Sequence, residues 1–341
     1  MAGSFDALVD RAVDDEATRR RLGVHTTAEE TYTSKFLAWE RRSSVRAKPR
    51  RVLADLAEEE RLGRVFFPPE LVAALEHPLL AGLGPDEVRR ILIHRLHIYL
   101  EFTAELEQTV VNPMVQQISR RRSGFELPET MVEDAYKIYT DEAWHAQFSD
   151  DLQRQIHKAT GVGPCLPETP RFLHRLHATE AAMDERSRAL AAVFFTIVSE
   201  TLISAVLSDI PRDKRVVGPV RELVADHAID EGRHHAYFSQ LLRSIWPQLN
   251  ARERAAVGPV LPEFILAFLE PDVAATACML AECGLEREQA KQVIWELYHP
   301  DRSRPGIRKA AQKTVDHLRH CGVLDEPGTL EAFQRAELVT A

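Results

Sequence analysis

The chain has 341 residues and a formal net charge of −9, with 45% hydrophobic and 7% aromatic side chains. Its length suits one large domain or two small ones, and its hydrophobic content allows a sizeable core. The acidic balance argues against non-specific binding to nucleic acid, which requires a basic face. Abundant Ala, Leu, Arg and Glu favour helices over strands.

Cysteine usage and the amino terminus bear on localisation. The four cysteines, Cys165, Cys278, Cys283 and Cys321, form no CxxC pair. This spacing argues against a disulfide scaffold or a thiolate zinc site, so we predict reduced thiols and a cytoplasmic protein. Residues 1–20 lack a basic region followed by an apolar stretch, so no secretory signal or membrane anchor is expected there.

The first part of the chain is expected to lead into the core of the fold. Residues 1–50 look like a helical segment that ends in a basic stretch, "RRSSVRAKPRR" (41–51). This stretch could bind an acidic surface, but a solvated connector is the simpler interpretation. "FFPPE" (66–70) predicts a turn before the next helix, because proline favours the first helical position.

Four long helices are predicted in succession, since apolar residues recur there at helical spacing: 84–113, 128–158, 171–208 and 219–245. The first is expected to stop at Pro113 and the last before Pro247. Shorter helices are expected within 251–338, and no segment requires a strand.

These elements predict an all-α protein with a four-helix bundle. We expect one domain over residues 1–341, with the bundle at about 85–246 and helical extensions at 1–84 and 247–341. Residues 189–207 are nearly long enough to span a bilayer, but they carry Glu200 near their middle. A central helix of the bundle core is the preferred interpretation, and no membrane association is expected.

Glutamates and histidines interrupt the apolar faces of the four helices. Of the glutamates Glu101, Glu105 and Glu107 on the first helix, only Glu107 sits within the apolar face. The second and fourth helices each carry Glu-x-x-His within "DE-x-x-H", and the third carries Glu200. The inward set is Glu107, Glu142, His145, Glu200, His227, Glu231 and His234.

Several buried carboxylates need positive charge between them, because an isolated buried charge is costly. The order Glu, Glu-x-x-His, Glu, Glu-x-x-His is the ligand pattern of carboxylate-bridged di-iron or di-manganese centres in helical bundles. Oxygen and nitrogen ligands without thiolates favour iron or manganese over structural zinc. Glu-x-x-His also occurs at Glu296 and His299, where a helix end is the simpler interpretation.

Other residues on these faces are candidates for supporting roles. Asp141 and Asp230 precede the two motif glutamates and could accept a hydrogen bond from the second nitrogen of a ligand histidine. Exposed helical aspartates are an equal alternative. Candidate substrate-pocket residues, for which ordinary core packing is the simpler alternative, are Thr103, Tyr139, Phe195, Thr196, Ile197, Leu202 and Phe238.

With these residues, the chain resembles the non-haem di-iron arylamine N-oxygenase family (p-aminobenzoate N-oxygenase-like), which belongs to the ferritin-like superfamily. The distinctive match is a third histidine, His227, one turn before the last motif in "HAIDEGRH". "ELEQTVVNP" around Glu107 also looks similar. The resemblance covers about 90–245 well and the remainder loosely.

The resemblance implies a ferritin-like bundle that binds two iron ions, with manganese as an alternative, and uses O₂ as cosubstrate. It implies oxidation of a primary amine, aryl or alkyl, to a hydroxylamine, nitroso or nitro product, in secondary metabolism. Electrons would come from a ferredoxin or a reductase, because no flavin or nicotinamide fingerprint is visible. The substrate could be free or tethered to a carrier protein, and a homodimer remains an alternative to a monomer.

Three other functions remain open. The same scaffold could oxidise carbon by hydroxylation, desaturation or decarboxylation. It could handle iron as a ferroxidase or store, although the long flanking segments argue against a compact cage subunit. A metal-free interaction protein would have to explain Glu200 inside an apolar helix.

Overall fold

The computed structural model describes residues 32–206 and 209–339, without the side chains of 204–206. Residues 1–31 of the predicted lead-in at 1–50 lie outside the described residues. Within them the protein is all-α and contains no strand, apart from one isolated bridge between Val65 and Val216. The all-α prediction is confirmed.

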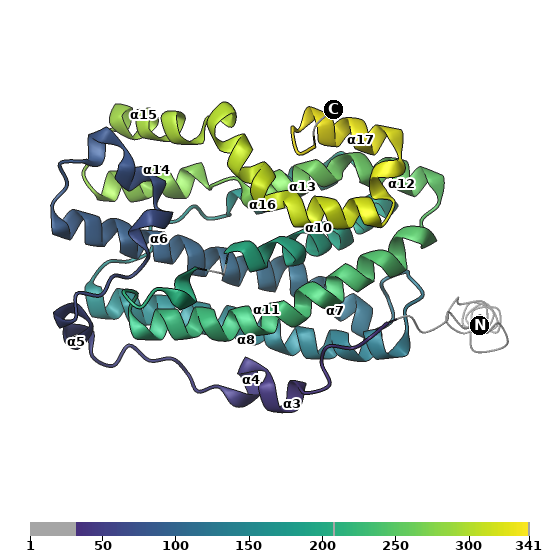
Figure 1. The fold of residues 1–341 in the computed structure, drawn as a ribbon, viewed down its shortest axis with the longest axis horizontal. Coiled ribbons are helices and arrows are strands. Elements are labelled where there is room, and N and C mark those ends of the chain that lie inside the picture. Colours follow the sequence, from purple (N-terminus) through teal and green to yellow (C-terminus); the bar gives the residue numbers. More distant parts are fainter. Residues whose placement is uncertain (1–31, 207–208, 340–341) are drawn as a thin grey trace, which may run out of the picture.

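The middle layer of the molecule is a bundle of long helices (Figure 1). The long helices follow one another along the chain as predicted, and α6 packs against α8 and α10 against α11. Their bounds are α6 Pro85–Leu106, a π-helical turn η4 Glu107–Val111, α7 Asn112–Ser119, α8 Glu129–Thr160, α10 Glu185–Val206 and α11 Gly218–Ile245. This is the ferritin-like four-helix arrangement that the sequence predicts.

The prediction that the first long helix stops at Pro113 is wrong. The π-helical turn η4 interrupts the α-helix, and the chain continues as α7 to Ser119. Pro113 lies in the first turn of α7, where its missing N–H costs little. The predicted break was wrong because the π-helical turn places Pro113 in the first turn of a new α-helical segment, where proline is tolerated.

The third predicted helix is two helices, α9 Arg171–Ala181 and α10. Asp184 separates them: its carboxylate accepts hydrogen bonds from the backbone N–H and the hydroxyl of Ser187 and so caps α10. The side chains of α10 from Leu190 to Ile203 are almost all buried on every side of the helix. The prediction of a central core helix there is confirmed for these residues.

Two further layers cover the bundle. Short amino-terminal elements run beneath α8 and α11, and the carboxy-terminal helices lie over α6 and α10 (Figure 1). The elements beneath are α3 Trp39–Arg42, α4 Ser44–Ala47 and α5 Leu56–Arg61. The carboxy-terminal helices are α12 Ala251–Val257, α13 Leu261–Leu269, α14 Val273–Glu282, α15 Arg287–Tyr298, α16 Pro300–His320 and α17 Pro327–Arg335. The turns η1 Pro69–Leu71, η2 Ala73–Glu76 and η3 Pro78–Leu80 lie on this same side, near α14 and α15. Four short turns complete the helical elements: η5 Ile210–Arg212, η6 Trp246–Gln248, η7 Gly258–Val260 and η8 Val323–Asp325.

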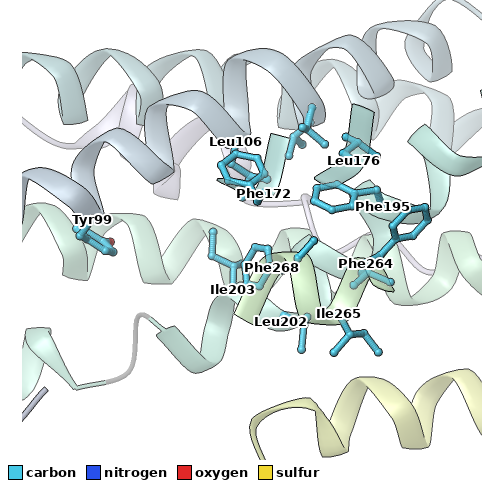
Figure 2. Packing of buried hydrophobic residues seen from close by; sticks show 14 of the residues in the cluster. Tyr99, Leu106, Phe172, Leu176, Phe195, Leu202, Ile203, Phe264, Ile265 and Phe268 are labelled. Atoms are coloured by element: carbon cyan, nitrogen blue, oxygen red, sulfur yellow. The ribbon is translucent and has the colours of Figure 1, made fainter. Parts of the chain in front are cut away.

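One hydrophobic cluster joins the bundle to the carboxy-terminal layer, and its buried members extend from Phe36 to Leu338. Figure 2 shows Phe264, Ile265 and Phe268 of α13 gathered with Phe195, Leu202 and Ile203 of α10. The Phe195 and Phe264 rings meet edge to face, with centroids 5.4 Å apart. Each buried side chain of this size contributes about 1.5–3 kcal/mol, so α13 anchors the outer layer.

The stretch Ala251–Glu282 has the length and hydropathy of a membrane-crossing helix. The structure divides it into α12, α13 and α14, and half of its most apolar part is buried within the protein. This stretch is therefore only weak evidence for a membrane span, because the core helices of a folded protein have the same length and hydropathy.

The prediction that all cysteines are reduced is wrong for one pair. Cys165 and Cys278 form a disulfide, with Cα atoms 5.9 Å apart, whereas Cys283 and Cys321 are free. The pair was not recognised because 113 residues separate its members, and only tertiary packing of the 161–170 loop against α14 brings them together. Disulfides are commoner in oxidising compartments, so the cytoplasmic location remains a prediction.

Candidate metal centre and adjoining cavity

Six of the seven predicted ligand residues bring their ligand atoms together in the bundle core. Two overlapping groups have all ligand atoms within 4.8 Å: Glu107, His145, His227 and Glu231, and Glu142, His145, Glu231 and His234. Each of these six side chains is at most 1% exposed. His145 and Glu231 belong to both groups, so the geometry suits two adjacent cations that share ligands.

Helical spacing aims the side chains at one another. On α8 and α11, an i, i+3 step places His145 Nδ1 3.1 Å from Glu142 Oε2, and His234 Nδ1 3.1 Å from Glu231 Oε1. Contacts also cross the bundle, because His234 Nδ1 lies 2.9 Å from Glu142 Oε1.

The third histidine belongs to the same cluster. His227 Nε2 lies 3.0 Å from Glu107 Oε1 and 3.3 Å from Glu231 Oε1. Glu107 begins the π-helical turn η4. A π-helical turn inside an α-helix frequently marks a functional site, because it redirects the side chains that follow.

The chemistry of these side chains fits a pair of divalent metal ions. Buried polar atoms nearly always have hydrogen-bond partners, yet several carboxylate and imidazole atoms here have none. They are both oxygens of Glu107, one oxygen each of Glu142, Glu200 and Glu231, and both ring nitrogens of His227. Lone pairs that converge without donors are what a bound cation requires.

Glu200 lies close to the cluster but outside its two tight groups. It is 1% exposed. Burial, followed by the charges of Glu231 and Glu142, raises its pKa well above the ordinary value. Burial likewise raises the pKa of Glu107 to about 7, with partial opposition from His227. Carboxylates in this environment favour protons or cations, which supports a metal-binding role for both.

The two supporting aspartates lie where the sequence suggests, but each serves the opposite helix. His145 Nε2 of α8 lies 3.2 Å from Asp230 of α11, and His234 Nε2 of α11 lies 3.3 Å from Asp141 of α8. These contacts orient both rings, so that Nδ1 faces the cluster. Burial opposes ionisation of Asp230, but the hydrogen bonds from His145 and Ser44 and the charges of both histidines together lower its pKa to about 2.

An amino-terminal segment, residues 33–53, covers these aspartates, and we call it the strap. The Trp39 indole donates to both oxygens of Asp141 at 2.9 Å, and the Ser44 backbone N–H donates to Asp230 at 3.0 Å. Arg51 pairs with Asp226 and Glu222 of α11. Most basic side chains of this stretch are exposed, as the connector interpretation expects, while Arg50 and Arg51 also pair with carboxylates of α8 and α11.

A second feature is a cavity of about 530 Å³ between the bundle and the carboxy-terminal layer. Its walls come from α6, α9, α13, α14, α15 and α16, from the 161–170 loop and from η1 and η2. Three phenylalanines form part of the apolar wall, because the Phe102 ring lies 5.0 Å from that of Phe172 and 5.3 Å from that of Phe268. This volume and lining are typical of a site for a small organic molecule.

The structure does not gather the predicted pocket residues around this cavity. Thr103, Phe195, Thr196, Ile197, Leu202 and Phe238 are buried in the core, and none lines the cavity. Tyr139 is 39% exposed at the surface of α8. The predicted residues were chosen because they share helical faces with the ligands, and these faces point into the bundle interior. The cavity lies on the outer side of the bundle, where α9 and α13–α16 meet α6.

One wall residue connects the cavity with the metal cluster. Tyr99 lines the cavity and is 4% exposed. Burial, followed by the negative charge of Glu107, raises its pKa far above the ordinary value. Its phenol therefore lies within electrostatic reach of a ligand carboxylate. Sequence reasoning missed Tyr99, although its position two helical turns before Glu107 was a usable signal.

Comparison with known proteins agrees with this geometry. Residues 26–322 match the family model described as P-aminobenzoate N-oxygenase AurF. The chain is also 26% identical over 265 residues to a 4-aminobenzoate N-oxygenase from Streptomyces thioluteus. That alignment covers 76% of this chain and 77% of the relative. Because the family match spans most of the sequence and includes all seven candidate ligands, the chain belongs to the p-aminobenzoate N-oxygenase family.

Proposed function

We propose that this N-oxygenase uses two iron ions and O₂ to oxidise the nitrogen of a primary amine. The observation that carries the proposal is the convergence of unpartnered carboxylate and imidazole atoms in a buried cluster. The proposed ligands are Glu107, Glu142, His145, Glu200, His227, Glu231 and His234. Manganese is the alternative metal, because the same oxygen and nitrogen donors suit both.

Bound iron would supply oxygen activation, and the chain's own residues prepare the site for it. Asp230 and Asp141 contact Nε2 of His145 and His234, and with Nε2 as the donor Nδ1 of each ring would be available as a ligand. Buried helices on every side exclude bulk water, which strengthens each electrostatic interaction at the cluster. The Tyr99 phenol lines the cavity within electrostatic reach of Glu107, and the amine would enter past it.

The relative's name indicates that it acts on 4-aminobenzoate, which supports an arylamine as the substrate class here. The cavity's phenylalanines suit an aromatic ring. We propose that the product is a hydroxylamine or its nitroso or nitro successor. Electrons would come from a ferredoxin or reductase. The proposal also includes a substrate that is tethered to a carrier protein and a protein that forms a homodimer.

The test begins with anaerobic loading of Fe(II) and metal analysis. We expect two ions per chain. Addition of O₂ and a panel of aryl and alkyl amines should give products that gain oxygen at nitrogen, detected by mass spectrometry. Many irons per chain without amine oxidation would instead indicate iron storage. Oxygen insertion at carbon alone would contradict the proposal.

A further inference from the structure

The charges that line the cavity are unevenly balanced. Arg171 donates to Glu270 at 2.8 Å, and its backbone N–H donates to Asp272, which also caps α14. Glu101 accepts a hydrogen bond from Gln153. Each of these wall carboxylates therefore accepts a hydrogen bond from the protein. Glu270 and Asp272 do not need a bound cation to satisfy them.

Two cations of the wall, Arg95 and Arg302, form no ion pair among the described residues. Arg302 is exposed, whereas Arg95 is partly buried and its guanidinium lies over the Phe67 ring, 4.9 Å from the centroid. Burial lowers its pKa, with partial opposition from Tyr298 and Tyr99, two other wall residues. A partly buried guanidinium without an anion is costly, so the cavity is suited to receive one.

The position of Arg95 along α6 sets the length of a suitable ligand. Arg95 and Glu107 are twelve residues apart, which corresponds to about 18 Å along a helix. Tyr99 and Phe102 occupy the wall between them. An anion at Arg95 is therefore well separated from the metal cluster, by more than a single aromatic ring would span.

We propose that Arg95 binds the carboxylate of an elongated amine substrate whose amino end extends past Tyr99 toward the metal ligands. Arginine suits this role because its planar fork binds carboxylates through two parallel hydrogen bonds. The inference rests on the proposed function for the fate of the amine. The anion site itself needs only the cavity and its unpaired cation.

The test uses the Fe(II)-loaded protein without O₂ and measures binding by isothermal titration calorimetry. The probes are 4′-aminobiphenyl-4-carboxylate, its methyl ester and the shorter 4-aminobenzoate. We expect the biphenyl acid to bind about 10- to 100-fold more tightly than its ester, because one charge-assisted contact is lost in the ester. We also expect it to bind more tightly than 4-aminobenzoate.

Arg95→Gln should remove the preference for acid over ester, and Arg95→Lys should restore part of it. Arg302→Gln is the matched control, since Arg302 also lines the cavity but is exposed, and it should keep the preference. An equal affinity of wild-type protein for acid and ester would overturn the proposal without any variant. So would an undiminished preference in a folded Arg95→Gln protein, or tighter binding of 4-aminobenzoate.

The two proposals fail separately. Oxidation of amines with no discrimination between acid and ester would refute the anion site and leave N-oxygenation intact. Arg95-dependent binding of the biphenyl acid without any oxidation after O₂ and reductant are supplied would refute N-oxygenation and leave the anion site intact.

Discussion

The metal cluster and the cavity meet along the first long helix, but they are assembled from the chain in different ways. The six clustered residues come from the π-helical turn η4 and from α8 and α11, and those on α8 and α11 lie three or four residues apart. The cavity takes single residues from many segments between Leu71 and Ile307. A site built on helical spacing is specified locally, whereas a site built between layers depends on how those layers pack.

The largest expected effect comes from Glu231, which belongs to both groups of ligand atoms. Glu231→Ala should reduce metal content to one ion per chain or fewer and abolish product formation, because two histidine positions lose their shared carboxylate. Elemental analysis after iron loading measures this. Glu105→Gln is the control, since that glutamate lies outside both groups and should leave metal content unchanged. Full metal content in Glu231→Ala would refute its assignment as a ligand.

A large effect on the cavity side is expected from the Cys165–Cys278 disulfide. Cys165 lies in the loop that supplies Leu166 and Pro167 to the wall, and the disulfide joins this loop to α14. Its removal in Cys165→Ser/Cys278→Ser should lower the free energy of unfolding by about 2–4 kcal/mol. Urea unfolding with and without a dithiol reductant measures this change. The variant should not respond to reductant, and an unresponsive wild-type protein would contradict the pairing.

These two sites also explain what could be predicted from the sequence. Glu142/His145 and Glu231/His234 were predictable because the α-helix fixes where residues three apart point. The bundle was predictable for the same reason. The π-helical turn at Glu107, the cross-helix pairing of Asp141 and Asp230, and Arg95 were not recognised. Each depends on contacts between segments that only the folded protein brings together.

A moderate effect is expected where the metal cluster meets the strap. Asp141→Asn or Asp230→Asn should lower metal affinity or activity by about 10- to 100-fold, because the ligand histidine loses its orienting carboxylate. Competition with a chelator measures the affinity. If each aspartate orients a separate histidine, the loss of metal-binding free energy in the double variant should be no more than the sum of the losses in the two single variants. Unchanged affinity in both single variants would show that the rings are held by packing alone.

The smallest effect is expected at the edge of the strap, where Arg50 donates to both oxygens of Asp151 at 2.7 Å. The hydrogen bond from Arg50 lowers the pKa of Asp151 below its usual value. A carboxylate with a lowered folded-state pKa stabilises the protein above its unfolded-state pKa of about 3.9, and this contribution is lost as pH falls further.

Arg50→Gln should therefore lower the thermal unfolding midpoint slightly at pH 7, and the difference from wild type should shrink as the pH falls below about 4. Thermal unfolding across this range by circular dichroism measures it. Arg46→Gln is the control, because its partner Glu40 is more exposed, and a smaller change is expected. A difference that persists at low pH would mean that Arg50 acts through packing of its aliphatic stem, and that the strap is held over the metal cluster by Trp39 and Ser44 without help from this charge pair.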